Sequence, residues 1–162
     1  MTGSATPLHR MFCTFRVDDR LFGASTEDTP SAAGRGRQPG RLLLIDDTPF
    51  FLEVVKRYLA VEGHEVETAV NGEDGLARLW ADRPYDLIIS DIEMPVMDGW
   101  EFAREVRRRG IETPMLALTS LSGAANETKA RDCGYDSYEV KLDHDRLVRK
   151  VGNLLALHER PA

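Results

Sequence analysis

The sequence contains only two cysteines, Cys13 and Cys133, among its 162 residues. Two cysteines cannot form the disulfide framework of a small secreted domain. The first 30 residues hold no apolar run long enough for a signal peptide, and no stretch approaches the length of a membrane span. We therefore expect a reduced, cytoplasmic protein without membrane insertion, in which Cys133 is a small buried apolar residue.

The sequence also has no basic stripe. Residues 1–40 hold five basic and four acidic side chains, whereas residues 41–162 hold sixteen basic and twenty-three acidic ones. A surface that binds nucleic acid needs clustered Lys and Arg, because affinity comes largely from contacts with phosphates. The charge distribution therefore predicts no nucleic-acid partner.

The first 40 residues differ in composition from the rest. Residues 24–40, "ASTEDTPSAAGRGRQPG", are rich in small residues and Pro, without hydrophobic periodicity. Such a segment buries too little apolar surface to offset the entropy of ordering, so it is interpreted as a flexible linker. Residues 1–23 contain "MFCTFRVDDRLFG", which predicts a short β-hairpin. The remaining residues, 41–162, would form one domain.

Strand-like and helix-like patterns alternate through that domain. The expected strands are apolar and short, and they comprise residues 41–45, 65–70, 86–90, 114–119 and 137–140. The expected helices follow them at 49–63, 72–81, from Asp98 onward, at about 123–132, and over the stripe Leu147–Leu155. This alternation predicts an α/β fold with a parallel sheet covered on both faces. The flavodoxin-like, doubly wound strand order 2-1-3-4-5 is a common solution for five strands.

Polar side chains follow four of these strands at their carboxyl ends, which all meet at one edge of a parallel sheet. They are Asp46, Asp47, Asp91, Thr119, Ser120 and Lys141. Each alone has an ordinary structural explanation, since Asp often caps a helix and Lys is usually solvated. Their convergence on one crevice instead predicts a functional site.

Three neighbouring carboxylates repel one another unless a cation lies among them. A hard divalent ion with oxygen ligands fits Asp46, Asp47 and Asp91, and Mg²⁺ is the abundant choice. Because no histidine follows these strands, the pattern disfavours zinc.

A site of this composition can also hold a phosphoryl group. Phosphoryl transfer needs an in-line nucleophile and groups that bind the three equatorial oxygens. We expect Asp91 to be the nucleophile and to form an acyl phosphate. The metal, Lys141 and the Thr119 hydroxyl would then each bind one oxygen.

The motifs "LLLIDD", "SDIEMPVMDG", "LTS" and "EVK" resemble those of response-regulator receiver domains of two-component signalling. The resemblance covers residues 41 to about 158 and implies the strand order 2-1-3-4-5, which is known for chemotaxis receivers. It also implies that Asp91 takes its phosphoryl group from a phosphohistidine on a histidine kinase.

The resemblance implies further roles for individual residues. Asp47 would bind the metal directly, Asp46 largely through water, and Glu93 through its backbone carbonyl. Thr119 and Tyr138 occupy the positions that move on activation. A downstream protein would bind the face built from the fourth helix, the fifth strand and the fifth helix.

Two details of the sequence bear on this resemblance: the motifs that indicate a subtype, and the residue that follows the lysine. "DIEMP" with "YEVKLD" looks like receivers associated with chemotaxis kinases and coupling proteins, and the N-terminal "FCTFRVDDRLFG" is similar to the opening hairpin of chemotaxis coupling domains. The family usually has Pro after its lysine, often with a cis peptide, but here the residue is Leu142. A cis bond before a residue other than Pro costs about 2.5–4 kcal/mol, so we expect a trans bond.

Three functions remain open at this point. The first is a stand-alone receiver, a phosphoacceptor switch that is not an enzyme beyond its own dephosphorylation. The second is an adaptor or phosphate sink in a chemosensory array. The third is a hydrolase that forms an aspartyl phosphate, for which Glu93 stands two residues after the nucleophile. The short "EMPVMDG" loop leaves no room for the substrate cap of such a hydrolase.

Overall fold

The computed structural model describes residues 39–80, 83–141 and 143–158. Within them, five parallel strands form one sheet in the order β2-β1-β3-β4-β5, which confirms the predicted topology. The strands are β1 (Arg41–Ile45), β2 (Glu65–Ala69), β3 (Leu87–Ser90), β4 (Met115–Thr119) and β5 (Ser137–Val140). Strands β1 and β3 are neighbours although β2 lies between them in sequence, so the topology reverses at this pair.

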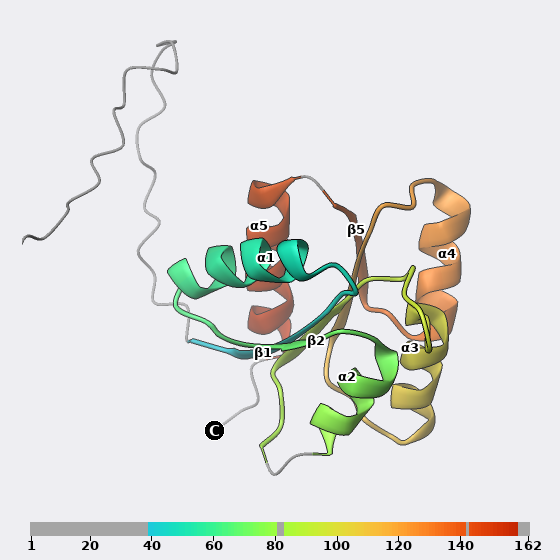
Figure 1. The fold of residues 1–162 in the computed structure, drawn as a ribbon. Helices are drawn as coiled ribbons and strands as arrows, with labels where there is room; N and C mark the ends of the chain where they lie inside the picture. Colours follow the sequence, from blue (N-terminus) through green and yellow to red (C-terminus); the bar gives the residue numbers. More distant parts are fainter. Residues whose placement is uncertain (1–38, 81–82, 142, 159–162) are drawn as a thin grey trace, which may run out of the picture. The chain divides into compact units, whose positions relative to one another are not determined.

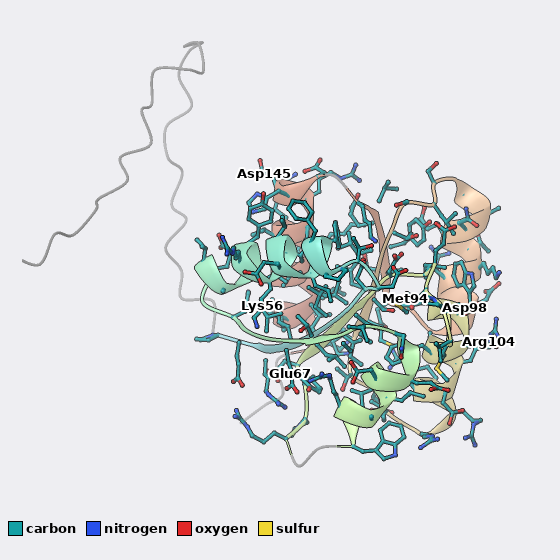
Figure 2. The ribbon with its side chains drawn as sticks, viewed as in Figure 1. Lys56, Glu67, Met94, Asp98, Arg104 and Asp145 are labelled. Carbon is teal, nitrogen blue, oxygen red and sulfur yellow. The ribbon has the colours of Figure 1, made fainter. Side chains whose placement is uncertain are left out.

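The helices alternate with the strands along the chain. They are α1 (Pro49–Val61), α2 (Gly72–Leu79), α3 (Gly99–Arg108), α4 (Ala124–Cys133) and α5 (His144–Leu157). Pro49 lies in the first turn of α1, and at the predicted start of α3 the Asp98 carboxylate accepts a hydrogen bond from the Glu101 amide at 2.8 Å. Figure 2 shows Asp98 at this start of α3 and Arg104 on the same helix.

The helices cover the sheet on both faces, with α1 and α5 on one side and α2, α3 and α4 on the other (Figure 1). Successive residues of β1 point into different cores. Leu42 and Leu44 pack with α1 and α5, whereas Leu43 and Ile45 pack with the opposite helices. Because both faces are buried, the central strands are apolar without alternation, as the sequence predicted.

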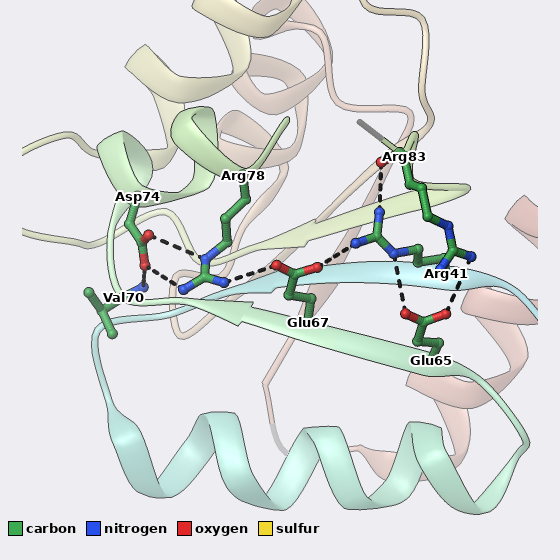
Figure 3. A network of polar contacts seen from close by, with 7 residues as sticks. All are labelled: Arg41, Glu65, Glu67, Val70, Asp74, Arg78 and Arg83. Carbon is green, nitrogen blue, oxygen red and sulfur yellow. Dashed lines mark hydrogen bonds and ion pairs between the residues drawn. The ribbon is translucent and has the colours of Figure 1, made fainter. Parts of the chain in front are cut away.

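The strand β2 lies at an edge of the sheet, where unpaired backbone groups would invite another strand. Charged side chains line this edge (Figure 3). We call them the edge network, and they comprise Arg41, Glu65, Glu67, Asp74, Arg78 and Arg83. The central contacts join Arg41 to Glu67 at 2.7 Å and Glu67 to Arg78 at 3.0 Å. Charge at an edge disfavours pairing with a second chain.

The folded unit begins slightly earlier than the sequence indicated. Gly40 is buried, its amide donates to Nδ1 of His64 at 3.1 Å, and its carbonyl accepts from the Glu65 amide at 3.0 Å. The linker predicted for 24–40 was therefore wrong at its last residue, because Gly40 completes the hydrogen bonding at the start of β1. The hairpin predicted for 1–23, and the linker up to residue 38, lie outside the described residues.

Three further features of the fold concern Cys133, Trp80 and the lengths of the helices. Cys133 is free and buried, as predicted for a small apolar residue. At the end of α2, the C-cap residue Trp80 is 47% exposed, and the Arg109 guanidinium lies over its ring. Among the described residues, no helix combines the length and apolar composition that crossing a membrane requires.

Candidate phosphoacceptor site

The two central strands bring the first two carboxylates together. Asp46 follows β1 and Asp91 follows β3, and the register that pairs Ile45 with Ser90 sets the two aspartates side by side. Main-chain hydrogen bonds continue the sheet through both: the Asp91 amide donates to Ile45 at 2.8 Å, and the Asp46 amide donates to Ala69 at 3.1 Å. The sheet itself therefore fixes the backbone beneath both carboxylates.

Asp47 completes a group of three acids. One carboxylate oxygen from each of Asp46, Asp47 and Asp91 lies within 4.8 Å of the others. Asp46 is 1% exposed and Asp91 is 5% exposed, whereas Asp47 is open to solvent. The predicted convergence of these three residues is thus present, with two buried oxygen donors and one that solvent can reach.

Lys141 neutralises part of this charge. Its ammonium lies 2.5 Å from Oδ2 of Asp46 and 2.7 Å from Oδ2 of Asp91, and its side chain is only 11% exposed. Its amide donates to the Thr119 carbonyl at 2.8 Å, so the backbone is fixed at the end of β5. One lysine serves two carboxylates, and the group keeps a formal charge of −2 with Asp47 included.

The electrostatics follow from burial and from these ion pairs. Burial raises the pKa of Asp46, and the adjacent Lys141 ammonium and the hydrogen bond from the Thr48 amide only partly offset this effect. Burial alone would lower the pKa of Lys141, but the contacts with Asp46 and Asp91 outweigh it and raise that pKa. Lys141 is therefore held as a cation.

The structure places the two predicted switch residues near each other on β4 and β5. Thr119 is fully buried, and its Oγ1 accepts a hydrogen bond from the Leu121 amide at 3.2 Å. Tyr138 is 9% exposed, and its hydroxyl donates to the Leu121 carbonyl at 2.6 Å. Both side chains thus bind the main chain of Leu121, in the loop between β4 and α4.

The loop after the phosphoacceptor candidate is tightly packed. Oδ1 of Asp91 accepts from the Ile92 amide at 2.6 Å, and the Glu93 amide lies 3.4 Å away. A Cβ on Gly99 would lie 2.3 Å from the Asp91 carbonyl oxygen, so only glycine fits there. The Tyr135 hydroxyl donates to the Gly99 carbonyl at 2.9 Å. The side chain of Glu93 is exposed.

The donors suit a hard divalent cation. They are all carboxylates, the ligands that Mg²⁺ prefers. Oδ2 of Asp46 is buried and lacks a hydrogen bond of good geometry, although the Lys141 ammonium is close. A buried, incompletely satisfied oxygen beside two further carboxylates is what an ion site requires. These residues therefore fit Mg²⁺.

Comparison with known proteins agrees with this geometry. Residues 42–152 match the model of the response regulator receiver domain. The chain belongs to this family. Receiver domains bind Mg²⁺ at an acidic pocket and take a phosphoryl group from histidine kinases of two-component systems.

Individual relatives resemble this receiver over most of its described length. The transcriptional regulatory protein PcoR of Escherichia coli is 34% identical over 116 residues, which are 71% of this chain and 51% of PcoR. The structure of TrrA from Thermotoga maritima, in complex with Mg²⁺ and BeF, is 37% identical with a TM-score of 0.64, covering 70% of this chain and 97% of that one. The chemotaxis response regulator CheY4 of Vibrio cholerae is 31% identical with a TM-score of 0.67, covering 72% and 99%.

These relatives refine the sequence-based expectations. The chain spans about half the length of the curated relatives it matches, and several of these are transcriptional regulators. The comparisons therefore do not support a chemotaxis subtype or the absence of a nucleic-acid partner. The resemblance of the N-terminal segment to coupling domains stays a prediction outside the described residues, as does the trans bond before Leu142.

One neighbour of the site was missed by reasoning from the sequence. The Lys141 ammonium lies 4.3 Å from the centre of the Phe51 ring. In the sequence, Phe51 is one of several apolar residues on α1, and nothing in the periodicity distinguishes it from a core residue. Only the rotation of α1 against the sheet places this ring under the lysine.

Proposed function

We propose that this receiver accepts a phosphoryl group on Asp91 from a histidine kinase and, in that form, changes its binding of a downstream partner. The observation that supports this is the cluster of Asp46, Asp47 and Asp91 with Lys141 on two of them, at the carboxyl edge of the sheet. The protein would act as a phosphoacceptor and not as an enzyme on a separate substrate.

The transfer conserves atoms and charge. An oxygen of the Asp91 carboxylate attacks phosphorus, a new P–O bond forms, and the P–N bond of the phosphohistidine breaks with its electron pair going to the imidazole. When bound by Asp47, by Asp46 through water and by the Glu93 carbonyl, Mg²⁺ would neutralise the carboxylates and one phosphoryl oxygen. Lys141 would bind a second phosphoryl oxygen.

Thr119 and Tyr138 would couple this event to the surface. Both side chains bind the main chain of Leu121, so a Thr119 hydroxyl drawn to the third phosphoryl oxygen would release the amide it now accepts from. The partner surface would be the face of α4, β5 and α5. A pocket of about 90 Å³ opens between α4 and β5 in this face, lined by Glu127, Arg131 and Tyr138 among others.

Glu93 would set the lifetime of the phosphorylated form. Its side chain is exposed and stands two residues after the acceptor, where it can reach a water that approaches the acyl phosphate. Glu93→Ala and Glu93→Lys should therefore change the rate of dephosphorylation while leaving Mg²⁺ affinity similar, because the metal ligand at this position would be the main-chain carbonyl. Dephosphorylation at the wild-type rate in both variants would contradict this role.

Phosphotransfer profiling tests the proposed function. Purified histidine kinases of the source organism, labelled on their histidine, are each mixed briefly with this chain and with its Asp91→Asn variant. We expect rapid transfer from one kinase to the wild type and none to the variant, which keeps the shape but lacks the nucleophilic anion. Transfer to Asp91→Asn at the wild-type rate would overturn the proposal.

A further inference from the structure

The Lys141 ammonium has a third neighbour besides its two carboxylates. Its nitrogen lies 4.3 Å from the centre of the Phe51 ring, well within the range of about 6 Å over which a cation is attracted to an aromatic face. The same nitrogen contacts Asp46 at 2.5 Å and Asp91 at 2.7 Å. Two carboxylates and one aromatic ring therefore lie around the ammonium.

The surroundings strengthen this contact. The Lys141 side chain is only 11% exposed, and cation–π attraction grows as the cation loses water. The ring is partly buried, because Phe51 packs against the core that α1 and α5 share. It also lines an apolar groove of about 250 Å³ with Val54 and Leu147. The ring thus faces the end of a lysine whose backbone amide is held by the Thr119 carbonyl.

The three partners of the Lys141 ammonium differ in whether a metal ion or a phosphoryl group can also bind them. A divalent ion competes for carboxylate oxygens, and a phosphoryl group would bind one oxygen of Asp91 covalently. A hard divalent cation binds oxygen ligands in preference to the face of an aromatic ring. Among the three described neighbours of the ammonium, the ring is therefore the one that neither the metal nor the phosphoryl group would take from Lys141.

We propose that Phe51 is a positioning residue, which holds the Lys141 ammonium beside Asp91 while Asp46 and Asp91 exchange partners. This inference rests on the proposed function of Asp91 as phosphoacceptor. It assigns Phe51 no contact with the phosphoryl group, since its effect acts through the lysine.

The first test observes the contact directly, without any reaction. Protons on the Cε of Lys141 should be shifted upfield by the ring current of Phe51 in the NMR spectrum of the wild type, with and without Mg²⁺. The shift should vanish in Phe51→Leu, which keeps apolar bulk, and persist in Phe51→Tyr. An unshifted Lys141 signal in the wild type would overturn the proposal, whatever the stability of the variants.

The second test measures function with a small phosphodonor, acetyl phosphate, so that no kinase surface is involved. Loss of a partly desolvated cation–π contact should slow phosphorylation of Phe51→Leu by roughly 5- to 30-fold, and Phe51→Tyr should recover most of the rate. The matched control is Phe50→Leu, because Phe50 is a neighbouring phenylalanine that is 79% exposed. Thermal midpoints identify any variant that fails to fold.

The outcomes separate this inference from the proposed function. A wild type that is labelled no more than Asp91→Asn would contradict the phosphoacceptor role itself. A labelled wild type with a folded Phe51→Leu that reacts at the same rate would overturn the role of Phe51 alone. Equal slowing of Phe50→Leu and Phe51→Leu would also overturn it, since the effect would then follow from the helix surface.

Discussion

The molecule holds two clusters of charged side chains, and they differ in how their charges balance. The edge network on β2 pairs three arginines with three acids and is formally neutral (Figure 3). The site beyond β1 and β3 sets Asp46, Asp47 and Asp91 against Lys141 alone. The first cluster is complete in itself, whereas the second has a charge deficit that a divalent cation and a phosphoryl group can use.

Burial differs between the clusters as well. Arg83 is 70% exposed and Glu65 is 59% exposed, so solvent and salt screen their contact at 3.7 Å. Asp46 and Lys141 are almost fully buried, and their interaction is hardly screened. The comparison suggests that screened, balanced charge protects a sheet edge, whereas buried, unbalanced charge is kept for function.

The largest expected effect concerns the metal. Asp47→Ala should weaken Mg²⁺ binding by more than about 100-fold, because it removes a direct ligand, whereas Asp46→Ala should cost about 10- to 100-fold, as an outer partner does. A titration followed by tryptophan fluorescence, with the buried Trp100 as reporter, measures both. If Asp46→Ala is the more damaging, the two roles are reversed.

The second largest effect is expected at Lys141, which contacts two of the three carboxylates. Lys141→Met leaves two buried carboxylates without a cation and should lower the free energy of unfolding by about 3 kcal/mol, while Mg²⁺ should restore much of this loss. Urea unfolding with and without Mg²⁺ gives both values. Stability equal to the wild type in metal-free buffer would show that the ion pairs contribute little.

The packing behind Asp91 can be tested separately from its charge. Gly99→Ala introduces a Cβ at 2.3 Å from the Asp91 carbonyl oxygen, so the phosphoacceptor must move. We expect a loss of about 1–3 kcal/mol in stability, as for other overpacked sites, together with slower phosphorylation. Thermal unfolding and labelling rates measure the two effects, and an unchanged labelling rate would contradict a packing role for Gly99.

The fold and the convergence of Asp46, Asp91 and Lys141 can be predicted from the sequence for physical reasons. Apolar runs of four to five residues alternate with helical patterns, so the carboxyl ends of β1, β3 and β5 had to meet, and with them Asp46, Asp91 and Lys141. Details that depend on three-dimensional register were not accessible. The contact of Arg41 with Glu65 requires the β1–β2 register, and the ring of Phe51 beneath Lys141 requires the rotation of α1.

A pH titration should sharpen the contrast further. The folded pKa of Lys141 is raised above its ordinary value of 10.5, so its ion pairs contribute fully below pH 10.5 and are lost as pH rises through the folded pKa. The wild type should therefore lose more stability above that pH than Lys141→Met does. Denaturant midpoints of both proteins across the alkaline range test this, and parallel curves would contradict it.

The smallest effect is expected in the edge network. Arg83→Ala removes only the exposed contact at 3.7 Å and should change stability by less than about 0.5 kcal/mol, with the difference vanishing at high salt. Urea unfolding at low and high ionic strength measures it. A loss as large as that of Lys141→Met would remove the distinction between the two clusters.

The most direct test of the account is to locate the phosphoryl group. The wild type is incubated with acetyl phosphate and Mg²⁺, and the labelled residue is then identified by peptide mass spectrometry after reduction of the acyl phosphate. We predict a single phosphoryl group on Asp91 that depends on Mg²⁺ and is absent from Asp91→Asn. Labelling on any other residue, or equal labelling of the variant, would contradict the assignment of this site.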